Sequence, residues 1–165
     1  MITIISGSSR NSNTKKVALE YQRLLREKKV DTVLLSLDEK KVFERDTSFI
    51  NMEKEFLKPA ERFIIIVPEY NGSYPGILKL MIDNTDVSKV WWHKKVLLTG
   101  VSTGRAGNLR GMDHLTNSLL YLKMVVHPNR LPISIIDKLL NGDHRLSDPG
   151  TLNAIDTQLN DFLNF

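Results

Sequence analysis

Short apolar segments alternate with helical patterns along the whole chain, and this alternation limits the possible folds more than any other feature. Strands are predicted at residues 2–5, 32–37, 63–67 and 95–101, and a fifth begins at 124–126 and resumes at 133–136. Helices are predicted at residues 14–28, around 49–57, and at 75–83, 109–122 and 151–163. Helical connections between short apolar strands imply right-handed crossovers and a parallel sheet covered on both faces. We therefore expect one α/β domain, residues 1–165, with a doubly wound, parallel, five-stranded sheet.

The composition is typical of a globular protein, because 41% of the 165 residues are hydrophobic and 25% are charged. No apolar run approaches the ~20 residues of a membrane span, and the first run has strand length and no basic leader, so neither a membrane partner nor a signal peptide is expected. The absence of cysteine excludes disulfides, thiol catalysis and thiolate metal ligands, and favours a cytoplasmic location. The formal charge of +4 is spread over separate lysine pairs, which predicts solvated surface charge and no nucleic-acid partner. The four histidines lack metal-ligand spacing, so no metal site is expected.

The first predicted strand ends in a hydroxyl-rich turn, and a helical pattern begins at once. Backbone N–H groups, hydroxyls and the positive end of a helix dipole are thereby aimed at one spot, which favours an anion, most often a phosphate. The turn matches neither the Gly-x-Gly-x-x-Gly loop nor a Walker loop, which needs Gly-Lys-Ser/Thr where Ser12, Asn13 and Thr14 stand. The side chains able to bind phosphate oxygens are Ser8, Arg10, Ser12, Asn13 and Thr14. A helix cap without a ligand is the alternative, but a cap needs one such residue and this turn offers several.

Polar, glycine-containing loops follow three of the predicted strands, at residues 6–14, 68–76 and 102–107. The carboxyl ends of parallel strands meet at one edge of the sheet, where ligands bind in doubly wound folds. We therefore expect the three loops to form a single binding site, with Gly72, Gly104 and Gly107 allowing backbone to approach the ligand.

One loop also fits a different class of protein. The segment from Gly100 to Gly104 has the Gly-x-Ser-x-Gly pattern of a hydrolase nucleophile elbow, with Ser102 as the nucleophile. Histidines and acids that could complete a triad follow downstream at His127, His144, Asp137 and Asp143. Hydrolase sheets of that kind usually need a longer chain, the sequence has no His-Gly-Gly oxyanion loop, and this hypothesis leaves the first loop unexplained.

The loop after the third strand is the most specific motif, Pro68-Glu-Tyr-Asn-Gly-Ser-Tyr-Pro-Gly76. Together with Gly7-Ser-Ser-Arg-Asn-Ser-Asn-Thr14 and Ser102-Thr-Gly-Arg-Ala-Gly107, it resembles the NADPH-dependent FMN reductase family, a flavodoxin-like group that includes quinone, azo-dye and chromate reductases. The matching segments run in order from about the first residue to Ser134. The chain departs from the family at Asn11, where glycine is common, and at Asn84-Thr85, where the family often has tryptophan.

The resemblance implies an FMN site in which the flavin carries the hydride and electron transfer, so that no catalytic side chain is required. Ser8, Arg10, Ser12, Asn13 and Thr14 would hold the phosphate. Pro68, Glu69, Tyr70, Asn71 and Gly72 would border the isoalloxazine. Ser102, Thr103, Gly104 and Arg105 would close its pyrimidine edge. The implied activity is transfer of a hydride from NADPH or NADH and reduction of free flavin, a quinone or another small acceptor; a one-electron carrier is the alternative among flavoproteins.

Three helices are rich in apolar residues. The first is expected to face the core through Val17, Leu19, Tyr21, Leu24 and Leu25. The helix at 75–83 and the helix at 109–122 have more apolar residues than one core-facing stripe requires, namely Ile77, Leu78, Leu80, Met81, Ile82, Leu115, Leu119, Leu120 and Tyr121. Because the family resemblance implies pairing through these helices, a homodimer or homotetramer is expected, with Met81 and Leu119 in its interface.

Overall fold

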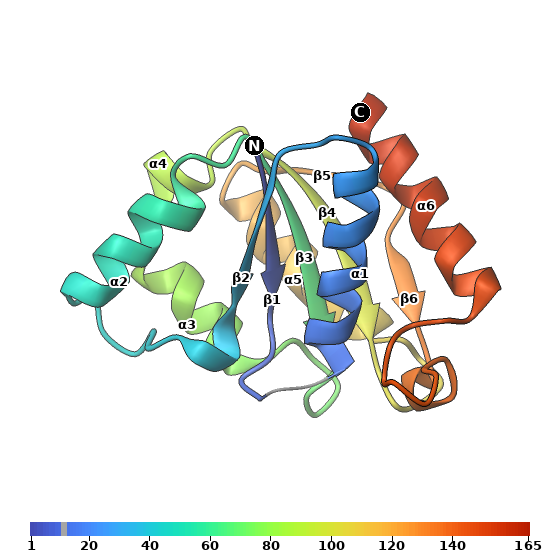
Figure 1. Cartoon of the computed structure of the whole chain (residues 1–165). Helices are drawn as coiled ribbons and strands as arrows, with labels where there is room; N and C mark the ends of the chain where they lie inside the picture. Colours follow the sequence, from blue (N-terminus) through green and yellow to red (C-terminus); the bar gives the residue numbers. More distant parts are fainter. Residues whose placement is uncertain (11–12) are drawn as a thin grey trace.

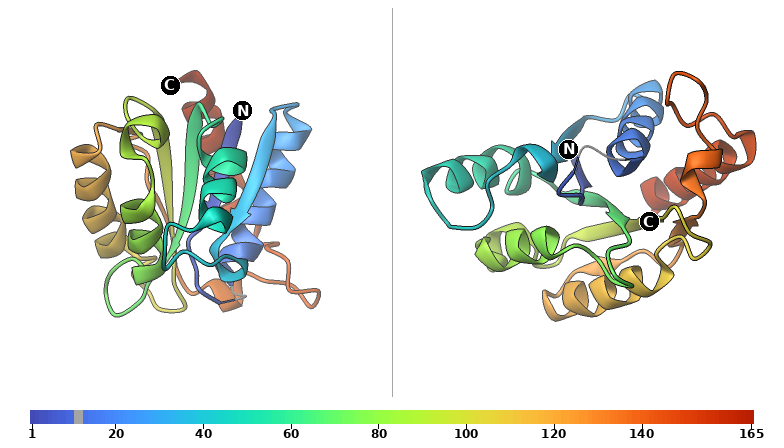
Figure 2. Two further views of the ribbon diagram at one scale, coloured as in Figure 1. Left: turned by 90° about the vertical axis from the view of Figure 1, so that its left-hand side faces the viewer. Right: turned by 90° about the horizontal axis from the view of Figure 1, so that it is seen from below.

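The computed structural model describes residues 1–10 and 13–165, which form one sheet covered by helices on both faces (Figures 1 and 2). The strands are β1 Ile2–Ser6, β2 Thr32–Ser36, β3 Arg62–Pro68, β4 Lys95–Val101, β5 Val125–Val126 and β6 Leu131–Ile133. Every pairing is parallel, and the order is β2-β1-β3-β4-β5, with β6 also paired to β4. This is the flavodoxin-like strand order, so the predicted doubly wound fold is confirmed.

The helices divide between the two faces of the sheet. They are α1 Asn13–Glu27, α2 Thr47–Met52, α3 Gly76–Asn84, α4 Val87–Val90, α5 Leu109–Tyr121 and α6 Pro149–Asn164. Three short turns add to them: η1 Leu37–Glu39, the π-helical turn η2 Glu53–Leu57, and η3 Ile136–Lys138. Helices α1 and α6 cover one face, and α2, α3 and α5 cover the other (Figure 2). Among the described residues, no helix has the length and apolarity needed to cross a membrane.

Alternate residues of the central strands enter two separate cores. Ile4 and Ile64 pack beneath α1 and α6, whereas Ile5, Phe63 and Ile65 pack beneath α3 and α5. All five side chains are fully buried. A strand buried on both faces reads as a continuous apolar run, which explains why the sequence pattern located these strands so closely.

The prediction that Leu19 of α1 faces the core is wrong. Leu19 is 48% exposed. The buried face of the helix consists of Thr14, Val17, Ala18, Tyr21, Gln22 and Leu25. Gln22 and Thr14 occupy positions that a purely apolar pattern would not assign to the core, and the stripe they complete turns Leu19 toward solvent.

The fifth strand position is occupied by two pieces, as the pattern predicted. The second piece lies at residues 131–133 and not at 133–136, because Ile135 has a positive φ of 46° and a 3-10 turn begins at Ile136. Val125 and Val126 pair with Lys95 and Val96, and Leu131 to Ile133 pair with Thr99 to Val101. Four residues, 127–130, therefore lie opposite only two residues of β4, 97–98, so the strand must bulge. Gln158 of α6 reaches into this break and donates to the carbonyl of Leu98 at 3.1 Å. The second piece continues to the site, because the carbonyl of Ile133 accepts from the N–H of Ser102.

Candidate functional site

Three polar loops meet at the carboxyl edge of the sheet, at the bottom of Figure 1. They follow β1, β3 and β4, whose pairing sets Ser6 beside Ile66, and Pro68 beside Val101. The predicted convergence of the loops is therefore confirmed. The geometry follows from the fold, because parallel strands in register deliver their carboxyl ends to one edge.

The first loop is attached to the second through hydroxyl groups. Ser8 is buried, and its Oγ lies 3.1 Å from the Tyr70 hydroxyl and accepts the N–H of Arg10 at 3.2 Å. The Ser9 hydroxyl approaches the same tyrosine at 3.5 Å. The Arg10 guanidinium lies 5.4 Å from the centre of the Tyr70 ring. These neighbours act together on Tyr70: burial alone would raise the pKa of its phenol, but the hydrogen bonds from Ser8 and Ser9 and the charge of Arg10 bring that pKa below its ordinary value.

The start of α1 is tied to a segment far along the chain. Asn13 donates through Nδ2 to the carboxylate of Asp137 at 2.6 Å, and its Oδ1 accepts from Lys16 at 3.0 Å. Thr14 is buried beside it. The helix begins at Asn13, so its positive end faces this loop. Ser12 and Asn11 lie outside the described residues.

The second loop makes a tight turn at its motif. Asn71 and Gly72 both have positive φ, 51° and 75°, and Tyr70 and Ser73 exchange two backbone hydrogen bonds across them. Positive φ at both central positions is the reason for Asn-Gly here. The N–H of Glu69 donates to the carbonyl of Val101, while Pro68 is buried at the end of β3.

The third loop is held in shape by Ser102. Its hydroxyl donates to the carbonyl of Gly104 at 2.9 Å and accepts the N–H of Gly107 at 3.0 Å. Thr103, Gly104 and Arg105 are exposed around it. A Cβ placed on Gly104 would meet nothing within 4 Å, so this glycine borders open space.

The role predicted for Gly107 needs correction. A Cβ added there would lie 2.6 Å from the Cβ of Pro132, and its φ is +56°. Gly107 therefore allows the loop to pack against β6 and does not open the backbone to a ligand. A Cβ added to Gly72 would lie 3.2 Å from the Arg110 guanidinium, whereas Gly104 borders open space.

A hydrolase arrangement is absent from the part of the chain that the structure describes. The Ser102 hydroxyl is engaged on both its donor and acceptor sides by the loop itself. The Nδ1 atom of His127 accepts the N–H of Asn129, and its ring packs edge-on against Phe162 and Phe165. No described histidine hydrogen-bonds to Ser102, so the base that would activate a serine nucleophile is missing.

Sequence reasoning missed three residues that organise the site. Ser9 joins Tyr70, and Asp137, considered only as a triad acid, holds Asn13. Asn108 is fully buried with φ +60° and donates to the carbonyls of Val67 and Pro68, which fixes the third loop to the end of β3. Its position directly after Gly107 and before a helix was a usable signal, because asparagine tolerates positive φ.

The donor set around the first loop fits a phosphate group. Hydroxyl and amide groups, a guanidinium and a helix N-terminus surround the first loop, and such groups bind phosphate oxygens. The carboxylate of Asp137 accepts a hydrogen bond from Asn13 at the edge of this donor set. Among the described residues, no group of three or more histidine, aspartate or glutamate side chains is placed to hold a metal ion.

Comparisons with known proteins agree with this geometry. The chain is 32% identical over 111 residues to an NAD(P)H-dependent FMN reductase of Pseudomonas aeruginosa, covering 64% of this chain and 59% of that protein. It is 33% identical over 76 residues to a 2-hydroxy-1,4-benzoquinone reductase of a Burkholderia species, covering 44% of this chain and 42% of that protein. The chain thus spans about half the length of these two curated relatives. Among solved structures, the flavoenzyme NAD(P)H:(acceptor) oxidoreductase FerB of Paracoccus denitrificans superimposes with a TM-score of 0.80 at 23% identity, covering 99% of this chain and 94% of that one.

The comparison with protein families identifies the chain's family. The sequence profile described as NADPH-dependent FMN reductase matches residues 1–136, which include all three loops of the site. This range covers most of the 165 residues. The chain belongs to the NADPH-dependent FMN reductase family.

Proposed function

We propose that this protein binds FMN at the three-loop edge and uses NADPH or NADH to reduce free flavin, quinones or other small acceptors. The hydrogen bond between Ser8 and Tyr70 is the observation that carries the proposal. It joins a phosphate-type loop to an aromatic loop, as a ligand with a phosphate at one end and a flat ring at the other requires. Family membership and the activities named for the two relatives support the same chemistry.

Each loop has a separate task in this proposal. Ser8, Arg10, Ser12, Asn13 and Thr14 hold the phosphate, where a helix N-terminus and a guanidinium favour negative charge. Residues 68–72 border the isoalloxazine, with the Tyr70 ring available for stacking. Ser102, Thr103, Gly104 and Arg105 face the pyrimidine edge.

The protein supplies binding, orientation and electrostatics. When bound, FMN supplies the hydride and electron transfer. The exposed Arg105 and the N–H groups of the third loop are placed to stabilise negative charge on a ring beside them, and the open space at Gly104 allows close approach. No side chain has to act as nucleophile or base.

Titration of the purified, flavin-free protein with FMN tests the proposal. Stoichiometric quenching of flavin fluorescence and a higher melting temperature are expected, because a ligand that binds only the folded state stabilises it. FAD should bind more weakly than FMN. Oxidation of NADPH or NADH in the presence of a quinone should show ping-pong kinetics. Tight binding of FAD without binding of FMN, or no flavin binding at all, would contradict the proposed function.

We also propose that the protein forms a homodimer or homotetramer through α5. Leu120 and Tyr121 lie on this helix and are 55% and 87% exposed. A groove of about 470 Å³ runs between α3 and α5, and Ile82, Tyr121 and Leu122 contribute to its lining. An exposed aromatic next to an apolar groove is typical of a protein interface.

The interface residues first predicted need correction. Met81 and Leu119 are fully buried and belong to the core between the sheet and helices α3 and α5. Charged residues at those positions would disrupt the fold and would not report on assembly.

Lack of cysteine supports the further proposal that the protein acts in the cytoplasm.

A further inference from the structure

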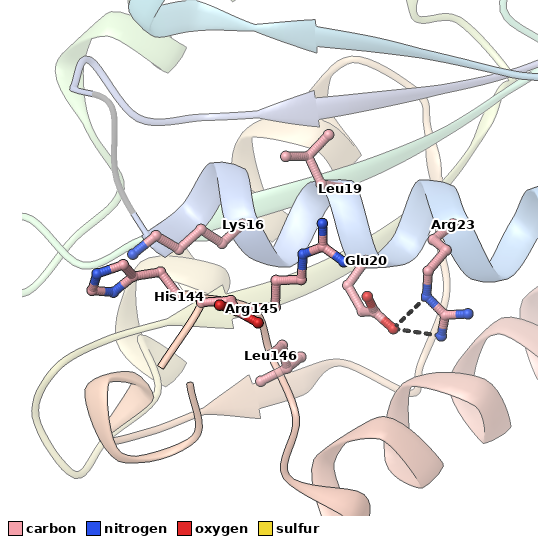
Figure 3. Close-up of a pocket in the computed structure, with 8 residues that line it drawn as sticks. Lys16, Leu19, Glu20, Arg23, His144, Arg145 and Leu146 are labelled. Carbon is pink, nitrogen blue, oxygen red and sulfur yellow. Dashed lines mark hydrogen bonds and ion pairs between the residues drawn. The ribbon is translucent and has the colours of Figure 1, made fainter. Parts of the chain in front are cut away.

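A concave region lies between α1 and the segment 143–146 (Figure 3). It has a volume of about 510 Å³. Lys16, Leu19, Glu20 and Arg23 line it from the helix, and Asp143, His144, Arg145 and Leu146 line it from the opposite segment. Figure 3 shows Lys16 and His144 at the end nearest the start of α1, and Arg145 extending over the helix.

The wall formed by residues 140–146 is held together by hydrogen bonds that involve its backbone. Leu140 and Leu146 form an antiparallel bridge, and Leu146 is buried in the core beneath α1 and α6. Between them, the side-chain oxygen of Asn141 accepts the N–H groups of Asp143 and Arg145 at 3.0 and 2.9 Å. The backbone that carries Arg145 is therefore fixed without any contribution from its side chain.

Cationic side chains in this groove are available to a ligand. Within residues 1–10 and 13–165, the Arg145 guanidinium and the His144 ring make no hydrogen bond or ion pair. Among the described residues, the partner of Lys16 is the neutral side-chain amide of Asn13, whose oxygen accepts from its ammonium group at 3.0 Å. Arg23 is paired with Glu20 and with Glu27, so the first of these acids is already neutralised. Asp143 is the remaining carboxylate on the lining.

The apolar part of the lining explains the exposed leucine of α1. Leu19, 48% exposed, lines this groove together with Leu146. A flat base can cover such a surface, while the cations bind phosphate and the carboxylates accept hydrogen bonds from ribose hydroxyls. Lys16 also connects the groove to the first loop through Asn13, one turn earlier on the same helix.

We propose that this groove binds the adenosine phosphate portion of a dinucleotide. The location beside Asn13 rests on the proposed function, but recognition of the adenosine phosphate itself depends on the groove alone. Two ligands carry this chemistry: FAD, whose AMP half continues from the flavin phosphate, and NADPH, whose adenosine bears a 2′-phosphate.

Calorimetric titration with 5′-AMP and with 2′,5′-ADP tests the groove independently of turnover. Arg145→Glu should weaken binding of the preferred probe by about tenfold or more, because a charge-assisted phosphate contact becomes a repulsion. Arg26→Glu is the matched control: Arg26 is exposed on the last turn of α1, outside the groove, and this variant should retain wild-type affinity. Rising salt should weaken binding in the wild type, since exposed charges are screened.

The outcome also separates the two sources. If FAD is the source, Arg145→Glu lowers the affinity for FAD while that for FMN is unchanged; if NADPH is the source, the KM for NADPH rises while that for NADH is unchanged. No binding of either probe, equal weakening by both variants, or unchanged behaviour in both arms would overturn the inference. FMN titration of the same variants keeps this failure distinct from failure of the proposed function, which would appear as loss of FMN binding in the wild type.

Discussion

Ser8 and Tyr70 are 62 residues apart in the sequence, yet their hydroxyl oxygens lie 3.1 Å apart. The contact joins the loop after β1 to the loop after β3 and is reinforced by Ser9 and by the Arg10 guanidinium over the tyrosine ring. Two segments with different predicted tasks are therefore joined into one surface by contacts within the protein itself. Such preorganisation lowers the cost of ordering the loops when a ligand binds.

Removal of the Tyr70 hydroxyl tests this contact. Tyr70→Phe should weaken FMN binding by about fivefold to tenfold, because loss of a neutral hydrogen bond costs ~1 kcal/mol. Tyr74→Phe is the matched control, since its hydroxyl contacts Ser118 of α5, at 3.1 Å, and not the first loop. Fluorescence titration would measure both. Equal effects of the two variants would show that the Ser8 contact has no special role.

A substitution at Ser102 tests whether its hydroxyl organises the third loop or acts as a nucleophile. Ser102→Ala should lower the free energy of unfolding by about 1–2 kcal/mol, because it leaves the buried N–H of Gly107 without its acceptor. It should weaken flavin binding and retain some reductase turnover, and a fluorophosphonate should not label the wild type. Ser147→Ala, at an exposed serine whose hydroxyl makes no hydrogen bond within the described chain, should leave stability unchanged. Stoichiometric labelling at Ser102 would revive the hydrolase hypothesis.

Substitution by alanine should affect stability very differently at two glycines of the same loop, Gly107 and Gly104. Gly107→Ala should destabilise the protein by about 2–4 kcal/mol, because its Cβ would overlap Pro132 and φ is positive. Gly104→Ala should change stability by less than ~0.5 kcal/mol, since nothing lies within 4 Å of its Cβ. If flavin approaches Gly104, this variant should still bind FMN less tightly. Denaturant unfolding and FMN titration together check the pair, and unchanged FMN affinity in Gly104→Ala would place the ring elsewhere.

Glu53 makes stability depend on pH. Its carboxylate is fully buried and contacts Arg45, Lys58 and the N–H of Asp86, at 2.7, 2.6 and 2.7 Å. Burial opposes ionisation, but the hydrogen bonds from Arg45, Lys58 and the Asp86 N–H prevail and lower the pKa of Glu53 from 4.5 to about 2. Because this pKa is depressed in the folded state, its stabilisation is complete above about pH 4.5 and is lost as the pH falls toward 2.

The corresponding substitution should remove that dependence. Glu53→Gln should cost on the order of 3 kcal/mol at pH 7 and show a flatter loss of stability between pH 5 and about 2. Glu55→Gln, two residues away at an exposed position, should behave like the wild type. Urea unfolding across this pH range is the measurement. A wild-type slope in Glu53→Gln would assign the acid sensitivity to other carboxylates.

Assembly can be tested at the exposed end of α5. Leu120→Glu with Tyr121→Glu should convert a dimer to a monomer without loss of folding, because both side chains are exposed. Leu109→Glu, exposed at the other end of the same helix, serves as the control. Light scattering at micromolar concentration gives the mass, and circular dichroism verifies the fold. A wild-type protein that is monomeric in this experiment would exclude the proposed interface.

The sequence by itself determined the order of the elements and the edge of the sheet that carries the site. A strand that is buried on both faces, such as 63–67, is a short continuous apolar run, and this pattern is typical of a central strand in a parallel sheet. Asn71-Gly72 specified its turn because few other pairs adopt positive φ at both positions. These features are local, so the sequence contains all that is needed to predict them. The confirmed convergence of the three loops followed from the topology that those elements imply.

Tertiary structure decided which side chains meet. The bond between Asn13 and Asp137, 124 residues apart, and the donation of Gln158 into the break between β5 and β6 depend on packing between distant segments. The same packing sent Leu19 to the surface, enclosed Met81 and Leu119, and filled the space above Gly107 with Pro132. An apolar residue or a glycine specifies a preference for burial or for backbone freedom, but not the partner it meets. That partner is fixed only when the sheet and its two helical layers close around it.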